Sequence, residues 1–270
     1  SPLRGEGAGP SSGKDGGQQR PITLLIAALG GEGGGVLTNW IVSAAEAQGF
    51  PVQSTSIPGV AQRTGATTYY LEIFPARREL LGGREPVLSL TPSPGNVDLV
   101  VASELLEAGR AMQNGYVTPE RTTLIASSHR IYSTAEKMQM ADGRFASERV
   151  LEAARQLARH AVLFDMRRLA QESGTVINAV LFGALAGSGA LPLPRPACEA
   201  AIRRSGKGAE ASLRGFAAGF DIAAGARRGA AGPAARYARD PGTRRGAPAR
   251  LPGRGLCQVV PRAHRHAGRG

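Results

Sequence analysis

One stretch near the start of the chain constrains the fold more than any other. From residue 22 to residue 36 the sequence reads ITLLIAALGGEGGGV, an apolar run followed by five glycines that only Glu32 interrupts. An apolar run of this length is typical of a buried strand, and the glycines before an amphipathic segment are typical of a tight turn into a helix. Glycine reaches backbone angles that other residues avoid, and bare N–H groups at a helix N-terminus attract anions. The stretch therefore predicts a strand–turn–helix unit of an α/β fold.

The glycines fail to match the dinucleotide-binding fingerprint. That fingerprint places glycine at its first, third and sixth positions, where this chain has Gly30, Glu32 and Gly35. A carboxylate at the third position would repel a pyrophosphate. The fingerprint also needs an acidic residue at the end of the second strand, but this strand ends in Ser56 and Ile57. We therefore do not expect a nicotinamide cofactor.

The rest of the chain alternates strand-like and helix-like segments. The loop between the strands predicted at 52–57 and 67–74 is too short for a crossover helix, so these strands should be antiparallel neighbours. Ser103 is placed to cap the helix predicted at 104–113. The fold class that follows is α/β, a Rossmann-like three-layer fold with a mixed, mostly parallel sheet and a helical C-terminal part. The remaining predicted strands are 97–102, 122–126 and 160–164, and the remaining predicted helices are 133–157 (broken at Gly143), 175–186, 195–205 and 210–220.

Charge and composition divide the chain into three parts. We predict a disordered leader at 1–20, one folded domain at 21–223 and a disordered tail rich in Arg, Gly, Ala and Pro at 224–270. The tail holds 11 arginines, one aspartate and no lysine or glutamate, so it carries ten of the twelve net positive charges. It has three interpretations: a polycationic arm for nucleic acid or anionic lipid, a solvated tail without specificity, or a GC-rich reading frame translated out of register.

Several classes of protein are disfavoured by the sequence. The leader lacks the apolar region of a signal peptide, and the apolar stretch at 175–193 contains Asn178, glycines and prolines, which favours a buried helix over a membrane span. Cys198 and Cys257 are far apart, so neither a disulfide nor a metal site is expected, which is typical of the reducing cytoplasm. His129 and His160 also lack partners at metal-ligand spacing, and we predict that both lie at the surface or at strand ends.

Two glycine segments carry a resemblance to a known family. GGEGGGV at 30–36 and GVAQRTGA at 59–66 resemble the GxGGQGV and GMAQRGG segments of the gamma-type domain of 2-oxoacid:ferredoxin oxidoreductases, at the same separation. DLVVASELLEAGRA at 98–111 and INAVLFGALAGSGALPL at 177–193 resemble later segments of that domain. The likeness spans 21–221, and within the family it is greatest to the beta subunits of indolepyruvate ferredoxin oxidoreductases.

Three residues depart from the family pattern. Glu32 stands where the family has glycine, Gly34 where it has glutamine, and Thr64 displaces the second glycine after Gln62 and Arg63. Glu32 puts any phosphate contact of this loop in doubt, whereas Gln62 and Arg63 are retained.

The resemblance implies a reaction and a set of partners. The reaction is the CoA-dependent oxidative decarboxylation of an arylpyruvate to an aryl-acetyl-CoA, carbon dioxide and two reduced ferredoxins. Such chemistry uses thiamine diphosphate with Mg and 4Fe–4S clusters, and we expect these in a large (alpha) partner subunit because two separated cysteines cannot hold a cluster. The chain would then be a cytoplasmic accessory (beta) subunit, inactive alone, with CoA as a substrate of the complex and ferredoxin docking through the large subunit.

The candidate site residues each have a structural alternative. Gln62 and Arg63 are the candidate catalytic residues, and Arg63 with the glycines of the loop is the candidate cofactor-binding set: Gly30, Gly31, Gly33, Gly34 and Gly35. Arg63 would bind a carboxylate or a CoA phosphate, or else form a salt bridge, and Gln62 would orient a substrate or hold its own loop. For Asp165 a structural ion pair is favoured, and for Asn178 a hydrogen bond to a neighbouring backbone group.

Two other functions remain open from the residues alone. One is a stand-alone Rossmann-like protein that binds a nucleotide or CoA. The other is a nucleic-acid binder that acts through the basic tail, although we do not expect nucleic acid or a membrane as the main partner because the tail lacks interleaved aromatic residues.

Overall fold

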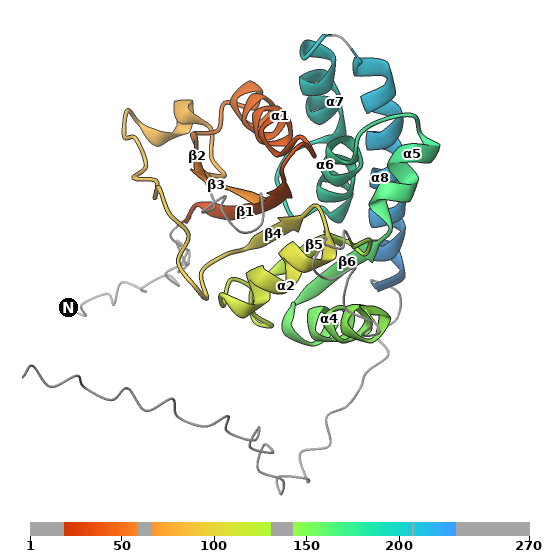
Figure 1. Cartoon of the computed structure of the whole chain (residues 1–270). Coiled ribbons are helices and arrows are strands. Elements are labelled where there is room, and N and C mark those ends of the chain that lie inside the picture. The colour runs from red at the N-terminus through yellow and green to blue at the C-terminus, as the bar shows by residue number, and fades with distance from the viewer. Residues whose placement is uncertain (1–18, 59–65, 131–142, 207, 231–270) are drawn as a thin grey trace, which may run out of the picture. The chain divides into compact units, whose positions relative to one another are not determined.

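A computed structural model describes residues 19–58, 66–130, 143–206 and 208–230 (Figure 1). These residues form a six-stranded sheet with helices on both faces. The strands are β1 (Ile22–Leu29), β2 (Val52–Pro58), β3 (Ala66–Ile73), β4 (Leu99–Ala102), β5 (Thr123–Ser127) and β6 (His160–Phe164). The helices are α1 (Gly34–Ala47), α2 (Leu105–Gln113), α4 (Gly143–Leu157), α5 (Met166–Glu172), α6 (Ile177–Ser188), α7 (Arg195–Arg204) and α8 (Ala209–Ala230), with a 3₁₀ turn, η1, at Arg78–Leu81.

The sheet is mixed and mostly parallel, as predicted. Its order is β2-β3-β1-β4-β5-β6. Strand β3 runs antiparallel to both of its neighbours, β1 and β2, whereas β1, β4, β5 and β6 pair in parallel. The short β2–β3 connection explains the antiparallel pair, because a parallel return needs a longer crossover. The carboxyl ends of the parallel strands consequently meet at one edge of the sheet, which we call the carboxyl edge, and their starts meet at the amino edge.

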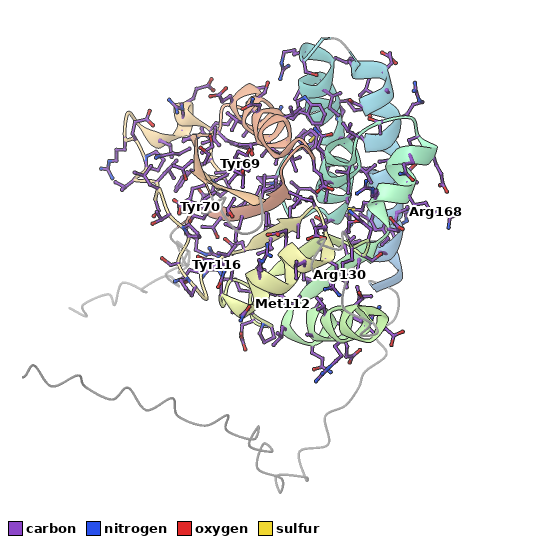
Figure 2. All side chains as sticks on the ribbon, viewed as in Figure 1. Tyr69, Tyr70, Met112, Tyr116, Arg130 and Arg168 are labelled. Atoms are coloured by element: carbon purple, nitrogen blue, oxygen red, sulfur yellow. The ribbon has the colours of Figure 1, made fainter. Side chains whose placement is uncertain are left out.

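The helices form two layers, one on each face of the sheet (Figure 1). One layer contains α1, α5, α6, α7 and α8, and the other contains α2 and α4. Alternate residues of each strand serve the two cores: Leu24 packs toward the α1 side and Leu25 toward the α2 side. Tyr69 and Tyr70, neighbours on β3, likewise lie on opposite faces (Figure 2). This alternation is the period-two pattern that places a sheet between two helical layers.

Helices α6 and α8 pack with their main chains in contact. A Cβ atom on Gly183 or Gly187 of α6 would overlap a carbonyl oxygen of α8, that of Phe216 or of Phe220. A Cβ on Gly219 of α8 would overlap the carbonyl oxygen of Val180. Helix α6 is therefore enclosed by protein on nearly all sides, which agrees with the prediction of a buried helix in this apolar stretch. Within the described ranges no helix combines the length and the apolar character that a membrane crossing requires.

The structure corrects three details of the sequence-based prediction. Helix α8 continues past the predicted domain limit at 223, so residues 224–230 are helical rather than part of a disordered tail. The other limits of the three-part division stay a prediction. Helix α5 is not predicted from the sequence. Asp165, for which the sequence predicts an ion pair, instead caps the start of this helix, because its carboxylate accepts the Arg168 N–H at 2.9 Å. Ser103 does not cap α2, because its hydroxyl is engaged elsewhere at the carboxyl edge.

Candidate functional site

The glycine turn leaves β1 at the carboxyl edge and leads directly into α1. Gly31 has φ 86° and Gly33 has φ 77°, both in the left-handed region that favours glycine. The Glu32 N–H donates to the Leu29 carbonyl at 3.1 Å, and the Leu37 N–H donates to the Gly33 carbonyl at 3.0 Å to begin the helix. Gly33 is the N-cap residue and has no side chain to cap the first N–H groups of α1.

Two of the glycines are needed for packing. A Cβ on Gly33 would lie 2.6 Å from the Asn178 Nδ2 atom. A Cβ on Gly34 would lie 2.6 Å from Ala28 Cβ and 2.7 Å from Tyr69 Cε2. Real Cβ atoms do not approach other atoms so closely. The protein's own side chains thus account for these glycines, because α1 could not lie this close to the sheet with larger residues.

The other candidate glycines differ in their surroundings. Gly30 and Gly31 are exposed, and a Cβ on Gly31 would meet no atom within 4 Å. A Cβ on Gly35 would lie 3.4 Å from the Tyr69 hydroxyl oxygen. Of the five glycines, Gly30 and Gly31 are thus the most exposed, Gly33 and Gly35 are partly exposed, and Gly34 is buried. A cofactor-binding role for any of the five glycines stays a prediction.

Asn178 connects the glycine turn to α6, as expected for a buried amide. Its Nδ2 donates to the Gly33 carbonyl at 3.4 Å. The partner is a backbone group, as predicted, but it is 145 residues away and the sequence does not identify it. Its Oδ1 is buried and accepts no hydrogen bond within the described part of the chain. The N-termini of α1 and α6 consequently meet at this side chain.

Glu32 turns away from the helix N-terminus and toward the neighbouring strand β4. The Ser103 hydroxyl, just after β4, donates to Glu32 Oε2. The Leu29 N–H in turn donates to the Ser103 Oγ atom at 3.0 Å. The carboxylate thereby ties the glycine turn to the next parallel strand, and this use of the Ser103 hydroxyl explains why it does not cap α2.

On its other side, Glu32 faces a histidine held by β5. The His129 Nε2 atom lies 3.7 Å from Glu32 Oε1. The His129 Nδ1 atom lies 2.7 Å from Ser127 Oγ, which also accepts the Met166 N–H at 3.0 Å. Only 8% of the His129 side chain and 13% of the Glu32 side chain are exposed. Glu32, Ser103, Ser127 and His129 form what we call the carboxyl-edge cluster, and it connects the ends of β1, β4, β5 and β6.

Sequence patterns alone do not reveal this cluster. The sequence predicts His129 at the surface or at a strand end; it follows β5 but is nearly buried. The one signal available from the sequence is position, because a polar residue lies within three residues of the end of each parallel strand, and these strands end together.

Two buried acidic residues lie near the cluster on the α2 side. Glu104 and Glu107, at the start of α2, are both buried. Burial raises the pKa of Glu107, the Arg110 guanidinium opposes this rise, and the charges of Glu104 and Glu32 add to it. Glu32, with the charge of Glu104 near it, disfavours a pyrophosphate at the N-terminus of α1, which agrees with the failure of the dinucleotide fingerprint.

Gln62 and Arg63, the candidate catalytic residues, lie outside the described residues. The strand ends on either side of them are described: Leu29 pairs with Ala66, and Pro58 pairs with Thr67. Both ends of the 59–65 segment therefore belong to the same edge of the sheet as the glycine turn. The roles of Gln62 and Arg63 stay a prediction.

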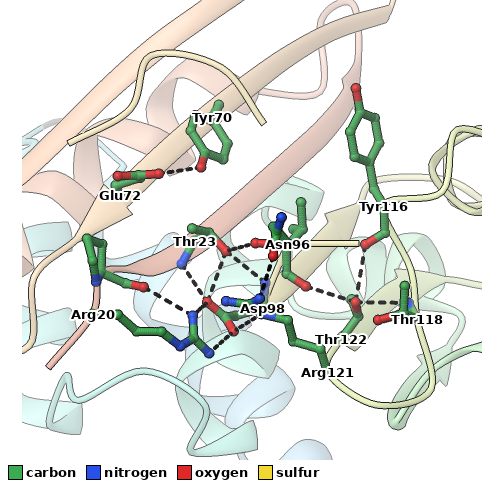
Figure 3. A network of polar contacts seen from close by, with 12 residues as sticks. Arg20, Thr23, Tyr70, Glu72, Asn96, Asp98, Tyr116, Thr118, Arg121 and Thr122 are labelled. Atoms are coloured by element: carbon green, nitrogen blue, oxygen red, sulfur yellow. Dashed lines mark hydrogen bonds and ion pairs between the residues drawn. The ribbon is translucent and has the colours of Figure 1, made fainter. Parts of the chain in front are cut away.

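The amino edge contains a different polar network, centred on Asp98 (Figure 3). Arg20 Nη2 lies 2.7 Å and Arg121 Nε 2.9 Å from Asp98 Oδ1, and the Thr23 N–H and hydroxyl donate to Oδ2 at 3.0 and 2.9 Å. Burial alone would raise the pKa of Asp98, but the hydrogen bonds from Arg20, Thr23 and Arg121 outweigh it and lower the pKa to about 2. The Asp98 carboxylate is therefore held ionised at every physiological pH.

A cavity of about 420 Å³ lies beside Asp98. Its polar lining includes Tyr70, whose hydroxyl donates to Glu72 Oε1 at 2.5 Å, and Glu72 Oε2 accepts the Ser89 N–H at 2.7 Å. Burial, together with the hydrogen bond to Glu72, raises the pKa of Tyr70. The buried polar groups at this edge have partners within the protein.

The sequence decides the family. Residues 23–222 match the family model described as pyruvate ferredoxin/flavodoxin oxidoreductase. The chain belongs to this oxidoreductase family. The match covers nearly the whole of the described fold, and it confirms the family inferred from the two glycine segments. The more specific indolepyruvate branch stays a prediction.

The chain is also similar to solved structures of oxidoreductase chains. A keto/oxoacid ferredoxin oxidoreductase gamma subunit from Geobacter sulfurreducens is 16% identical, with 76% of this chain and 99% of that chain covered and a TM-score of 0.50. The 2-oxoglutarate:ferredoxin oxidoreductase of Magnetococcus marinus, with 2-oxoglutarate, coenzyme A and succinyl-CoA bound, is 13% identical, with coverages of 77% and 32% and a TM-score of 0.53. A pyruvate oxidoreductase subunit from Thermotoga maritima is 18% identical, with coverages of 74% and 96% and a TM-score of 0.49.

At these identities the likeness concerns the fold, and it confirms the predicted fold class. The larger Magnetococcus chain contains this fold as about a third of its length. No curated protein sequence matches the chain.

The residues of this oxidoreductase chain can be tested against the cofactors that its family relationship suggests. Among the described residues, no three His, Cys, Asp or Glu side chains are grouped so as to hold a metal ion. Cys198 is buried in α7, and burial raises the pKa of its thiol to about 12. A thiol of this kind is a poor metal ligand, since ligands bind as thiolates. The described residues thus do not fit an iron–sulfur cluster or the magnesium of thiamine diphosphate.

Proposed function

We propose that this chain is the accessory (beta) subunit of an indolepyruvate or arylpyruvate:ferredoxin oxidoreductase. The complex would convert an aryl 2-oxoacid and CoA into an aryl-acetyl-CoA and carbon dioxide while reducing two ferredoxins. Thiamine diphosphate with Mg and 4Fe–4S clusters supply the decarboxylation and electron-transfer chemistry, and in this proposal they reside in a large (alpha) subunit. Ferredoxin docks on that subunit, and the complex is cytoplasmic.

The observation that carries the proposal is the placement of the two family-like segments. The glycine turn follows β1, and the strand ends that flank Gln62 and Arg63 pair with the end of β1 and with each other. Ligands of open α/β sheets bind at the carboxyl ends of the strands. In this proposal the glycine turn and the segment between these strand ends complete the reaction centre of a partner from one edge of the subunit.

The residues of this edge have separate tasks in the proposed complex. The glycine turn brings α1 against the sheet, since Gly33 and Gly34 leave no room for side chains. Arg63 binds the carboxylate of the oxoacid or a phosphate of CoA, for which a planar guanidinium is well suited. Gln62 orients the substrate by hydrogen bonding. The carboxylate of Glu32 accepts a hydrogen bond from Ser103 on the neighbouring strand, and in this proposal it takes no part in substrate binding.

Co-expression with the large subunit tests the proposal. The purified complex is assayed for CoA-dependent reduction of a viologen dye with indolepyruvate, phenylpyruvate, pyruvate and 2-oxoglutarate. We expect the aryl substrates to react fastest and the activity to be lost when this chain is omitted. Unchanged activity without the chain contradicts the proposal. Tight binding of CoA by the isolated chain, combined with unchanged activity of the large subunit, would favour a stand-alone CoA-binding protein instead.

Variants of Arg63 test its role within the same complex. We expect Arg63→Ala to raise the KM for CoA or for the oxoacid at least about tenfold, the loss expected for one charge-assisted contact. Arg78→Ala is the matched control, because Arg78 is exposed and its ion pair is with the exposed Glu85. An Arg63→Ala complex with unchanged KM values would show that Arg63 has a structural role.

A further inference from the structure

The hydrogen bonds of the carboxyl-edge cluster define where the protons lie on its β5 side. Ser127 is fully buried, and its Oγ atom accepts the Met166 N–H. Among the described residues the remaining partner of Ser127 is His129 Nδ1, so the hydroxyl hydrogen is donated to that nitrogen. An imidazole that accepts at Nδ1 carries its hydrogen on Nε2 when it is neutral. The neutral His129 therefore presents an Nε2–H group toward Glu32 Oε1.

The β4 side of the cluster can be oriented in the same way. The Leu29 N–H donates to Ser103 Oγ, and the Ser103 hydroxyl donates to Glu32 Oε2. Glu32 is thus an acceptor at both oxygens, one of them filled by Ser103 and the other facing His129. The Ser103 hydroxyl hydrogen and the His129 Nε2 hydrogen therefore both point toward the Glu32 carboxylate, and the Ser127 hydroxyl hydrogen points toward the imidazole.

The contact between His129 and Glu32 is incomplete. A separation of 3.7 Å is too long for a hydrogen bond and too short for a bridging water molecule. The His129 Nε2 atom is buried without a hydrogen-bond partner among the described residues. A buried donor without an acceptor destabilises the folded state. A shift of less than about 1 Å would complete the bond, and left-handed glycines on both sides of Glu32 allow the turn to move.

We propose that Glu32 and His129 form a proton-operated latch on the glycine turn. When His129 takes up a proton from solvent at Nδ1, the imidazolium attracts the Glu32 carboxylate, the gap closes, and the turn is clamped to β5 as well as to β4. In the charged state Ser127 Oγ accepts from Nδ1–H and from the Met166 N–H with its two lone pairs, and its own hydroxyl hydrogen then has no acceptor among the described residues, a cost that the ion pair between Glu32 and the imidazolium must exceed. His129 is a positioning residue that acts through Glu32, and the latch does not depend on the proposed function.

Other charged groups lie on the elements packed around the pair. Glu104 and Glu107 belong to the β4–α2 region with Arg110, Arg130 follows His129, and Asp165 precedes Met166. Histidine is the side-chain type that ordinarily changes charge between about pH 5 and pH 8, so a response in this window distinguishes a histidine from carboxylates and arginines.

Hydrogen exchange of the full chain, read by mass spectrometry, tests the latch. The readout is the protection of the peptide over residues 30–37 between about pH 8 and about pH 5.5, corrected for intrinsic exchange. We expect protection to rise at least about threefold as the pH falls in the wild type, and to be independent of pH in Glu32→Gln and in His129→Gln. His160→Gln is the matched control, because His160 is exposed at the start of β6, and it should behave as the wild type does.

Two outcomes would overturn the proposal. The first is wild-type protection that does not change with pH. The second is a pH response that survives in His129→Gln, because the response would then belong to one of the carboxylates. A tautomer measurement by imidazole ¹⁵N NMR remains decisive even where the histidine variant does not fold: neutral His129 should carry its hydrogen on Nε2 in the wild type, and Nδ1–H as the main form contradicts the latch.

Discussion

Asp98 and Glu32 are carboxylates at opposite edges of the same sheet, and their surroundings differ in the number and charge of the donors. Asp98 accepts from two arginines and from both donors of Thr23. Among the described residues Glu32 accepts a hydrogen bond from the Ser103 hydroxyl and faces His129 across 3.7 Å. The amino edge is thus fixed by charge-assisted bonds, while the carboxyl edge retains freedom to move. In open α/β sheets the carboxyl edge binds ligands, and ligand-binding segments are commonly the less stable, more mobile parts of a fold, so the mobile edge of this sheet is also the edge expected to bind.

Removing the Asp98 charge should give the largest effect on stability. Asp98→Asn leaves Arg20 and Arg121 facing an uncharged amide, and we expect the free energy of unfolding to fall by about 2–4 kcal/mol. Urea unfolding measures this loss. Glu85→Gln is the control, because its pair with Arg78 is exposed and should contribute less than about 0.5 kcal/mol. A loss for Asp98→Asn no larger than that of the control would remove the contrast between the two edges.

Acid should weaken the amino edge selectively. The pKa of Asp98 is about 2 in the folded protein, below the ordinary value of 3.8, so the unfolded chain binds the proton more readily. The stabilisation from Asp98 is therefore complete above about pH 4 and is lost as the pH falls through about 2. The difference in urea midpoint between the wild type and Asp98→Asn should shrink over this window. A difference that is constant from about pH 5 to about pH 2 would contradict the assigned ion pairs.

Ser103→Ala should have an intermediate effect. The variant removes the hydrogen bond from Ser103 to Glu32 and the acceptor of the Leu29 N–H. We expect a loss of about 1–2 kcal/mol in the free energy of unfolding and faster hydrogen exchange in the glycine turn. Ser89→Ala is a suitable comparison, since the Ser89 side chain is exposed and bonds the nearby Thr91 carbonyl. Equal effects of the two variants would mean that Ser103 does not hold the turn.

Glu32→Gln should have the smallest effect on stability. Glutamine keeps an oxygen that accepts the Ser103 hydroxyl, and the lost attraction to His129 acts across 3.7 Å, so we expect a change below about 1 kcal/mol near neutral pH. Urea unfolding at that pH measures it beside Asp98→Asn. A loss as large as that of Asp98→Asn would show that the two edges are equally rigid, and the comparison would fail.

The sequence predicts much of the fold because local patterns determine it. The apolar runs of β1, β4 and β6 indicate strands without any long-range information, and the glycines after β1 indicate where that strand ends. The length of the β2–β3 loop excludes a parallel pair. Helix α5 has only seven residues, too few for a helical period to show in the sequence, and Asp165 before it is the one usable signal.

The site could not be predicted in the same way, because its members are distant in sequence. Ser103 and Glu32 are 71 residues apart, and each has a plausible local role when taken alone. Serine before a helix usually caps it, so the sequence predicts a cap on α2, whereas the structure gives the hydroxyl to Glu32. Only the strand order brings the two residues together.

The close contact of α6 with α8 has a consequence for mutational scans of this chain. Gly183, Gly187 and Gly219 face main-chain oxygens, so every substitution there must push two helices apart. A Cβ on Gly225, on the same helix α8, would meet no atom within 4 Å, so this glycine should accept alanine. A scan scored by activity would therefore rank the first three glycines with the residues that touch substrate. Substitutions at these positions are not tolerated because the two helix backbones touch. A stability measurement is needed to distinguish this packing effect from a role in catalysis or substrate binding.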